Sequence, residues 1–201
     1  MPSGGKHTAM HQMNWKIILA SNSPRRRELM DGLGLPYEVR LMRGIDETYP
    51  EGLTPDEIPV FISRKKASAY TLASDELLIT ADTIVWLDGQ VLGKPHDAAE
   101  ACSMLRRLRE RTHQVITGVT LSSIEIQHSF SCTSDVTFGP LTDDEIAHYV
   151  SQYHPLDKAG AYGIQEWIGY VGVTCLRGSY FNVMGLPVQR LYTELKKLNV
   201  I

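Results

Sequence analysis

The stretch 77–97, LLITADTIVWLDGQVLGKPHD, decides how this chain folds. Its first ten residues are mostly apolar and rich in β-branched side chains, a pattern typical of a buried strand. The dipeptide Asp88-Gly89 follows, and it favours a two-residue hairpin turn that leads the chain back through residues 90–92. The sequence therefore predicts a central strand, a tight turn and a return strand that ends at Gly93-Lys94-Pro95.

A single carboxylate, Asp82, lies in the middle of this apolar run. Burial of an unpaired charge is costly, so the position indicates a partner such as a metal ion, a lysine or a substrate. The two-residue turn brings Lys94 back beside the strand, within reach of the neighbourhood of Asp82. A buried Asp–Lys pair with a purely structural role is the alternative interpretation.

Composition and charge limit the class of protein. The 201 residues, 43% hydrophobic and 21% charged, have the composition of an ordinary globular domain with a substantial core. The net charge of -3 argues against broad binding to nucleic acid or to an anionic membrane, and no apolar run is long enough to span a bilayer. Cys102, Cys132 and Cys175 form no CxxC pair, which predicts reduced thiols in a cytoplasmic protein.

Residues 1–13 are expected to form a disordered or expression-derived leader, because they are polar and lack the apolar core of a secretory signal. Residues 14–201 contain no internal repeat, low-complexity tract or linker. We therefore expect them to form a single α/β domain.

The segment 15–30 predicts a short strand followed at once by a helix. Ser23 is a favoured N-cap and Pro24 a favoured first helical residue, so free backbone N–H groups lie at this end. The run Arg25 to Arg27 occupies the first turn, where cations do not complement the helix dipole. The arrangement indicates a phosphate-binding site, and a solvated basic turn is the alternative.

The rest of the chain alternates helix and strand signals, which is typical of an α/β domain. Capping boxes begin helices at Thr54 and at Asp97. Alternating apolar residues predict strands over 113–122 and 130–138, joined by a hairpin. Further strands are expected over 37–41 and 171–177, and further helices from Thr142 and from Pro187.

A second unusual stretch, 157–165 (DKAGAYGIQ), combines small residues with Asp157, Lys158 and Gln165. Glycine and alanine let a backbone approach a ligand closely, while the three polar side chains supply an acceptor, a cation and an amide. This composition is typical of a ligand-facing loop, although tight packing between two elements is the alternative. The adjacent carboxylates Asp46-Glu47, in an earlier loop, are a weak signal by themselves.

Six motifs, in this order, resemble the signature blocks of the Maf family. Each block alone is weak evidence, whereas the ordered set, from about residue 15 to residue 198, is specific. The blocks are ASNSPRR at 20–26, ADT at 81–83, GKP at 93–95, HQVITGV at 113–119, DKAGAYGIQ at 157–165, and GSY to GLP over 178–187.

The resemblance implies a nucleoside triphosphate pyrophosphatase that cuts between the α and β phosphates with the help of a divalent metal cation, Mg²⁺ or Mn²⁺. It also implies an elongated mixed β-sheet flanked by helices, with two lobes around a central cleft and an inosine triphosphatase-like architecture. The 157–165 block resembles the branch that acts on dTTP and UTP, and modified pyrimidine nucleotides are further candidate substrates. Family members are linked to septum formation, and the resemblance allows a homodimer.

Catalytic roles follow from the resemblance together with the chemistry of the side chains. Asp82 is expected to accept the proton of the attacking water. With Glu47 it is also expected to bind the metal, since Mg²⁺ prefers oxygen ligands and takes some of them from substrate phosphates. Lys94 is expected to neutralise charge that develops on the phosphates. Asp97 is expected to orient Lys94 or the metal.

Substrate-binding roles are assigned in the same way. Arg25 and Arg26, assisted by Ser21, are expected to grip the triphosphate. Lys66 is expected to add a point charge, and only the family pattern selects it over its neighbour Lys65. The base-selecting positions of the dTTP/UTP branch correspond to Arg26, Thr83 and Gln165.

The chain departs from the family pattern at three places. Asn22 stands where glycine is frequent, Lys65 stands where glutamate is frequent, and Glu166-Trp167-Ile168 replaces a smaller segment. The last departure affects base preference and leaves the chemistry untouched.

Two other functions compete with the enzyme. A non-enzymatic nucleotide-binding regulator of septum formation and cell division would use the same cleft, but it has no use for a water-activating carboxylate such as Asp82. A nucleic-acid-binding module built on Arg25 to Arg27 agrees poorly with the acidic net charge and with the lack of interleaved exposed aromatic residues. We therefore expect an enzyme without a nucleic-acid or membrane partner.

Overall fold

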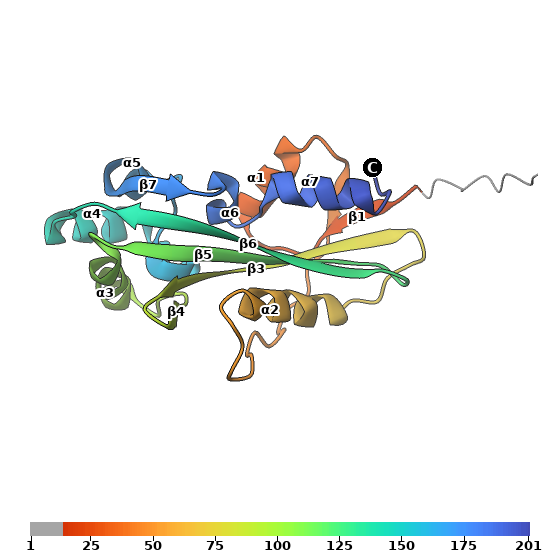
Figure 1. Cartoon of the computed structure of the whole chain (residues 1–201), viewed down its shortest axis with the longest axis horizontal. Helices are drawn as coiled ribbons and strands as arrows, with labels where there is room; N and C mark the ends of the chain where they lie inside the picture. Colours follow the sequence, from red (N-terminus) through yellow and green to blue (C-terminus); the bar gives the residue numbers. More distant parts are fainter. Residues whose placement is uncertain (1–13) are drawn as a thin grey trace, which may run out of the picture.

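The computed structural model describes residues 14–201, and the predicted leader over residues 1–13 lies outside these described residues. One mixed sheet has the strand order β2-β1-β3-β5-β6-β7, and β4 also pairs with β3. The molecule is elongated because the long strands β3, β5 and β6 run side by side along its length (Figure 1). The structure thus confirms the predicted α/β class with a mixed sheet flanked by helices. The elements are β1 (Lys16–Leu19), α1 (Pro24–Gly32), β2 (Tyr37–Val39), α2 (Glu57–Ser68), β3 (Glu76–Leu87), β4 (Gln90–Leu92), α3 (Ala98–Leu108), β5 (Thr112–Ser122), β6 (Gln127–Phe138), α4 (Asp143–Tyr153), the 3-10 helices η1 (Pro155–Asp157) and η2 (Ala159–Ala161), α5 (Trp167–Gly172), β7 (Val173–Arg177), α6 (Tyr180–Met184) and α7 (Val188–Lys197).

The predicted central hairpin is present. β3 and β4 form an antiparallel ladder in which Leu87 lies opposite Gln90. Asp88 and Gly89 connect them with φ angles of 50° and 78°. Both angles are in the left-handed region that a two-residue turn of this kind requires, which explains why an Asp-Gly pair stands there.

One edge of β3 is open in its middle. The other edge pairs with β5 over most of its length. On the open side, β3 pairs in parallel with β1 as far as Ile79, and it pairs again with β4 only from Val85 onward. Within residues 14–201, no strand covers residues 80–84 on this side. Asp82 and Thr83 lie in this gap between β1 and β4.

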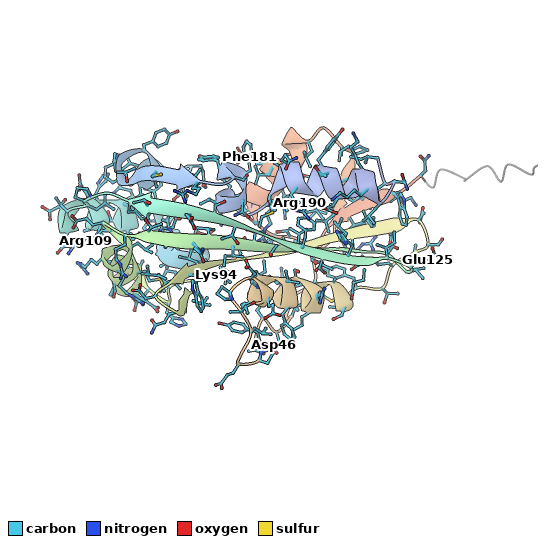
Figure 2. The ribbon with its side chains drawn as sticks, viewed as in Figure 1. Asp46, Lys94, Arg109, Glu125, Phe181 and Arg190 are labelled. Atoms are coloured by element: carbon cyan, nitrogen blue, oxygen red, sulfur yellow. The ribbon has the colours of Figure 1, made fainter. Side chains whose placement is uncertain are left out.

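Helices cover both faces of the sheet. In Figure 1, α2 lies on one side of the long strands, while α1, α6 and α7 lie on the other. Gly118 of β5 allows α2 to pack closely, because a Cβ atom at this glycine would lie 2.3 Å from the carbonyl carbon of Pro59. Figure 2 shows the same division, with Lys94 and Phe181 on opposite sides of the long strands. Since side chains alternate along a strand, Asp82 faces α2 and Thr83 faces α6.

Helix ends agree with the sequence at two positions and differ at a third. Ser23 caps α1 by accepting a hydrogen bond from the backbone N–H of Arg26, and Thr142 begins α4 with a complete capping box. α2 begins at Glu57 and not at Thr54. The Glu57 carboxylate accepts hydrogen bonds from both the backbone N–H and the hydroxyl of Thr54, as the Glu145 carboxylate does from Thr142. Within the described residues no backbone N–H donates to the Thr54 hydroxyl, so only half of the predicted capping box is present.

Two short helices depart from the sequence prediction. α5 occupies the start of the predicted 171–177 strand, so β7 begins only at Val173. α6, five residues long, was not predicted. Helices of one to two turns are too short to show the 3.6-residue periodicity on which the prediction depends. None of the helices in the described range has both the length and the apolar character needed to cross a bilayer.

Candidate functional site

A cavity of about 300 Å³ lies at the gap in β3. Because β3 has a free edge here, side chains from both faces of the sheet reach the same space. The cavity brings together eight of the ten residues that the sequence predicts for the site, namely Arg25, Arg26, Glu47, Lys66, Asp82, Thr83, Lys94 and Gln165.

Two carboxylates and one ammonium group form the centre of the α2 side of the cavity. The Nζ atom of Lys66 lies 2.8 Å from Asp82 Oδ1 and 2.9 Å from Glu47 Oε1. The side chains of Lys66 and Asp82 are 15% and 13% exposed, so this pair is shielded from water. The sequence placed Lys94 within reach of the neighbourhood of Asp82. Lys94 lines the cavity, but the observed ion pair is made by Lys66, which the close packing of α2 at Gly118 brings under the strand.

The neighbouring lysine has a different environment. Lys65 Nζ donates hydrogen bonds to Asp46 Oδ2 at 2.6 Å and to the Thr48 carbonyl at 3.1 Å. Figure 2 places Asp46 on the loop that projects beside α2. Consecutive helical residues differ by about 100° around the axis, so Lys65 turns toward this loop while Lys66 turns toward the sheet.

The charge of Glu47 depends on its cationic neighbours. Partial burial alone would raise the pKa of Glu47, but the Lys66 ammonium outweighs it, with help from Lys94 and Arg26. The pKa of Glu47 is therefore lowered from its ordinary value. Glu47 is a carboxylate at neutral pH, available to a cation or to a water molecule.

On the opposite face of the sheet, Arg26 is fixed by two hydrogen bonds. Its Nε donates to the carbonyl of Gly185 at 2.7 Å, and its Nη2 donates to Thr83 Oγ1 at 3.1 Å. Burial lowers the pKa of Arg26, which the negative charge of Asp82 opposes, and the guanidinium remains protonated. Its Nη1 group makes no hydrogen bond within the described part of the chain and is available to a ligand.

Arg25 connects helix α1 to the 157–165 loop. Its Nη1 lies 3.1 Å from Asp157 Oδ2, and Lys158 Nζ lies 2.7 Å from the other oxygen of the same carboxylate. Burial would raise the pKa of Asp157, but Lys158 and Arg25 together lower it. The loop therefore forms a wall of the cavity that carries alternating charges.

Gln165, at the end of this loop, has an unpaired acceptor. Its Oε1 atom is buried and accepts no hydrogen bond within residues 14–201. A buried acceptor without a partner is costly, so its position in the cavity wall points to a ligand donor. The adjacent Glu166, one of the departures from the family pattern, is held by Lys158 at 3.2 Å and by the hydroxyl of Tyr149. The departure thus anchors the loop that carries Gln165.

A buried histidine supports the same loop. His113 on β5 is 2% exposed, and its Nε2 lies 2.7 Å from the hydroxyl of Tyr162, which lines the cavity. Burial lowers the pKa of His113 to about 4, so the ring is neutral at neutral pH. His113 therefore positions the loop and supplies no charge to the cavity.

Two predicted site residues lie outside the cavity lining. Ser21 Oγ accepts a hydrogen bond from the backbone N–H of Ser23 at 3.2 Å, which stabilises the turn into α1. Asp97 is the N-cap of α3, where it accepts from the N–H of Glu100 at 2.8 Å. Asp97 thus has a structural use that its capping signature already indicated, and the structure does not bring its carboxylate to Lys94.

Two residues behind the cavity lining carry no prediction from the sequence. Thr117 and Asn182 stand directly behind Thr83 in a chain of buried hydrogen bonds. Both belong to stretches that match family blocks, but their contact depends on strand register and on a helix that the sequence did not reveal. No local pattern could have found them.

The carboxylates of Asp82 and Glu47 fit a hard divalent cation that prefers oxygen ligands. The described residues contain no cluster of three or more His, Cys, Asp or Glu side chains that could enclose a metal. Asp82 and Glu47 lie together on the α2 side, joined by one ammonium group, and offer carboxylate oxygens as the only protein ligands that we assign. This donor set suits a hard cation that takes its remaining ligands from water and from substrate phosphates, as Mg²⁺ does.

Comparisons with known proteins identify the family of this chain. The profile of a family described as Maf-like protein matches residues 16–198. A dTTP/UTP pyrophosphatase of Phocaeicola vulgatus is 62% identical over 186 residues, which cover 92% of this chain and 96% of that protein. A dTTP/UTP pyrophosphatase of Bacteroides thetaiotaomicron is 59% identical with the same coverage. Among solved structures, a HAM1 protein from Coxiella burnetii shares the fold, with a TM-score of 0.50 at 15% identity over 91% of this chain and 99% of that chain.

Proposed function

Since the chain belongs to the Maf family, we propose that it is a nucleoside triphosphate pyrophosphatase that hydrolyses the α-β phosphate bond of dTTP and UTP. The products are the nucleoside monophosphate and pyrophosphate. Relatives at 62% and 59% identity are named for this activity. The observation that carries the proposal is one cavity lined by three carboxylates and five cationic side chains. The carboxylates are those of Glu47, Asp82 and Asp157, and the cations are those of Arg25, Arg26, Lys66, Lys94 and Lys158.

Asp82 serves as the proton acceptor for the attacking water. One of its oxygens is held by Lys66, while the other makes no hydrogen bond within the described residues. The ion pair with Lys66 fixes the carboxylate in one orientation, which a general base requires. The bond that forms joins the water oxygen to the α phosphorus, and the bond that breaks joins this phosphorus to the oxygen bridging to the β phosphate.

The cations bind the triphosphate and neutralise the charge that develops as pyrophosphate leaves. Arg25 and Arg26 extend from the N-terminus of α1, and Lys94 follows β4, so they approach the cavity from different sides. Asp82 and Glu47 would hold a divalent cation, Mg²⁺ or Mn²⁺, which supplies Lewis-acid stabilisation of phosphate oxygens when bound. Lys66 holds the two carboxylates together, and its ammonium group outweighs the effect of burial and lowers the pKa of Glu47.

Thr83 and Gln165 read the pyrimidine. The unpaired, buried Oε1 of Gln165 is an acceptor that the N3–H group of uracil or thymine satisfies, and its amide nitrogen can donate to a ring carbonyl. The proposal extends to modified pyrimidine nucleotides. A cytoplasmic location and a homodimer belong to the same proposal, and sedimentation analysis of the purified chain tests the dimer.

Measurement of pyrophosphate release tests the function. The full chain is incubated with dTTP, UTP, CTP and GTP in Mg²⁺, in Mn²⁺ and in EDTA. We expect dTTP and UTP to give monophosphate and pyrophosphate in a metal-dependent reaction. Tight nucleotide binding without pyrophosphate release would favour the competing function, a regulator of cell division that binds nucleotide without cutting it. Release of orthophosphate would place the cleaved bond elsewhere in the triphosphate.

A further inference from the structure

A chain of buried hydrogen bonds leads from the cavity into the core. Thr83 Oγ1 lies 2.9 Å from Thr117 Oγ1, its partner across β3 and β5. Thr117 Oγ1 in turn donates to the backbone carbonyl of Asn182 on α6 at 3.1 Å. Thr117 and Asn182 are both completely buried, so water does not compete for these bonds.

The direction of these bonds is fixed by the number of protons. A hydroxyl group has one proton to donate, and a carbonyl oxygen can only accept. The Thr117 proton is therefore used by the Asn182 carbonyl, so the Thr83 hydroxyl must donate to Thr117. The proton of Thr83 is then committed to the core, and only its lone pairs face the cavity. One lone pair accepts from Arg26 Nη2 at 3.1 Å.

The far end of the chain is rigidly held. Asn182 Nδ2 donates to the carbonyl of Val115 at 3.1 Å and to Ser134 Oγ at 3.0 Å, so the first turn of α6 is anchored to two strands. Three residues later, the carbonyl of Gly185 accepts from Arg26 Nε at 2.7 Å. α6 thus restrains Arg26 directly at Gly185 and indirectly through the two threonines.

We propose that Thr117 is a positioning residue, which acts through Thr83 to make that hydroxyl an acceptor-only contact for the base and to fix the guanidinium of Arg26. This inference rests on the proposed function, because it concerns how the same site selects pyrimidines. Uracil and thymine carry a hydrogen on N3, whereas N3 of cytosine is itself an acceptor. Where it faces N3 of the base and not the 4-amino group of cytosine, an acceptor-only Thr83 beside the unpaired acceptor of Gln165 favours the first two bases.

The test compares hydroxyl-deleting variants at two buried threonines of β5. Thr117→Val removes the hydroxyl at nearly constant volume and frees the Thr83 proton to point into the cavity. We expect kcat/KM for UTP to fall about 10-fold relative to kcat/KM for CTP, the size expected when a buried polar group loses its partner. Thr117→Ser, which retains the donor, is expected to restore the wild-type ratio.

Thr120→Val is the matched control. Thr120 is also completely buried on β5, but it faces α2 and bonds to Ser63 at 2.7 Å and to Ser129 at 3.0 Å. Its loss is expected to lower stability without changing the UTP/CTP ratio. Equal effects of Thr117→Val and Thr120→Val on the ratio, or no effect of Thr117→Val, would overturn the proposal. If Thr117→Val fails to fold, Thr117→Ala carries the same expectation.

A double-mutant cycle identifies the route of the effect. If Thr117 acts through Thr83, the variant Thr83→Val/Thr117→Val has the same UTP/CTP ratio as Thr83→Val alone. Additive losses would show that Thr117 acts by another route and would overturn the positioning role. These outcomes are separable from a failure of the proposed function, which would show itself as wild-type protein that releases no pyrophosphate from any nucleotide.

Discussion

Asp82 and Thr83 are adjacent in the chain, yet they build two different halves of one cavity. Asp82 faces α2, where its neighbours are the charged groups of Lys66 and Glu47. Thr83 faces α6, where its contacts are Arg26 and neutral hydrogen-bonding groups in the core. Both halves border the same space because, among residues 14–201, no strand pairs with β3 between β1 and β4. We therefore expect that bond cleavage depends on the Asp82 half of the cavity and that base selection depends on the Thr83 half.

The largest effect is expected from Asp82→Asn, which keeps the shape of the side chain and removes the proton acceptor. Turnover with dTTP should fall by about 10³-fold or more, since general-base catalysis and orientation of the water are both lost. Binding of dTTP, measured by calorimetry, should weaken much less. A variant that keeps most of its turnover would exclude Asp82 as the base, and it would end the assignment of cleavage to this half of the cavity.

A smaller effect is expected from Lys66→Met, which leaves two carboxylates facing each other without their shared cation. We expect kcat/KM for dTTP to fall about 100-fold, the usual scale for loss of one charged group in an active site. Lys66 is the main cause of the lowered pKa of Glu47, so the pKa of Glu47 should rise in the variant.

The pH dependence distinguishes this effect from simple unfolding. In the wild type, the lowered pKa keeps Glu47 ionised well into the acidic range. When the pKa rises in Lys66→Met, Glu47 is protonated at a higher pH, so the acidic limb of the pH–rate profile should shift to higher pH. An unshifted acidic limb in an active variant would remove Glu47 from the ionisations that the reaction requires.

Features of the two halves that depend on adjacent residues could be predicted from the sequence. Features that depend on contacts between distant residues could not. The apolar run around Asp82, the Asp-Gly turn and the Ser23 cap each depend on a few adjacent residues, and all are present in the structure. The choice of Lys66 as the partner of Asp82 depends on how α2 packs on β5, which no local pattern specifies. The contact of Thr83 with Thr117 joins residues 34 positions apart through strand register.

The same distinction explains Asp97. Its role as an N-cap was visible in the capping signature, whereas its expected role in orienting Lys94 or the metal came from the resemblance together with the chemistry of the side chain. Asp occurs both in the signature blocks of the family and at helix N-caps. The sequence alone does not show whether a given Asp carboxylate caps a helix or acts in the functional site. The structure shows the capping use, in which Asp97 Oδ1 accepts from the backbone N–H of Glu100.

On the Thr83 half, Gln165→Ala is expected to change selection more than rate. The variant removes the buried, unpaired acceptor, so the preference for UTP over CTP should fall about 10-fold. Turnover of dTTP at saturation should stay within about threefold of the wild type, because the amide lies away from the cleaved bond in the proposed pose. Ratios of kcat/KM across the four nucleotides measure the change. A loss confined to kcat, with unchanged ratios of kcat/KM among the nucleotides, would show that Gln165 acts in bond cleavage. The two halves of the cavity would then not have separate roles.

The smallest effect is expected from Lys65→Met, the neighbour control for Lys66→Met. Lys65 pairs with Asp46 on the loop that carries Glu47, and the Asp46 side chain is 59% exposed. Surface ion pairs contribute little, so kcat/KM should stay within about twofold of the wild type. The hydrogen bond from Lys65, with those from Thr48, lowers the pKa of Asp46. The contribution of this pair to the free energy of unfolding is therefore fully present above the unfolded pKa of about 3.9, and it declines as the pH falls below that value. Lys65→Met could instead reduce kcat as strongly as Lys66→Met at neutral pH. This result would mean that the position of Glu47 depends on the attachment of its loop to α2, so that the exposed Lys65–Asp46 pair belongs to the Asp82 half of the site.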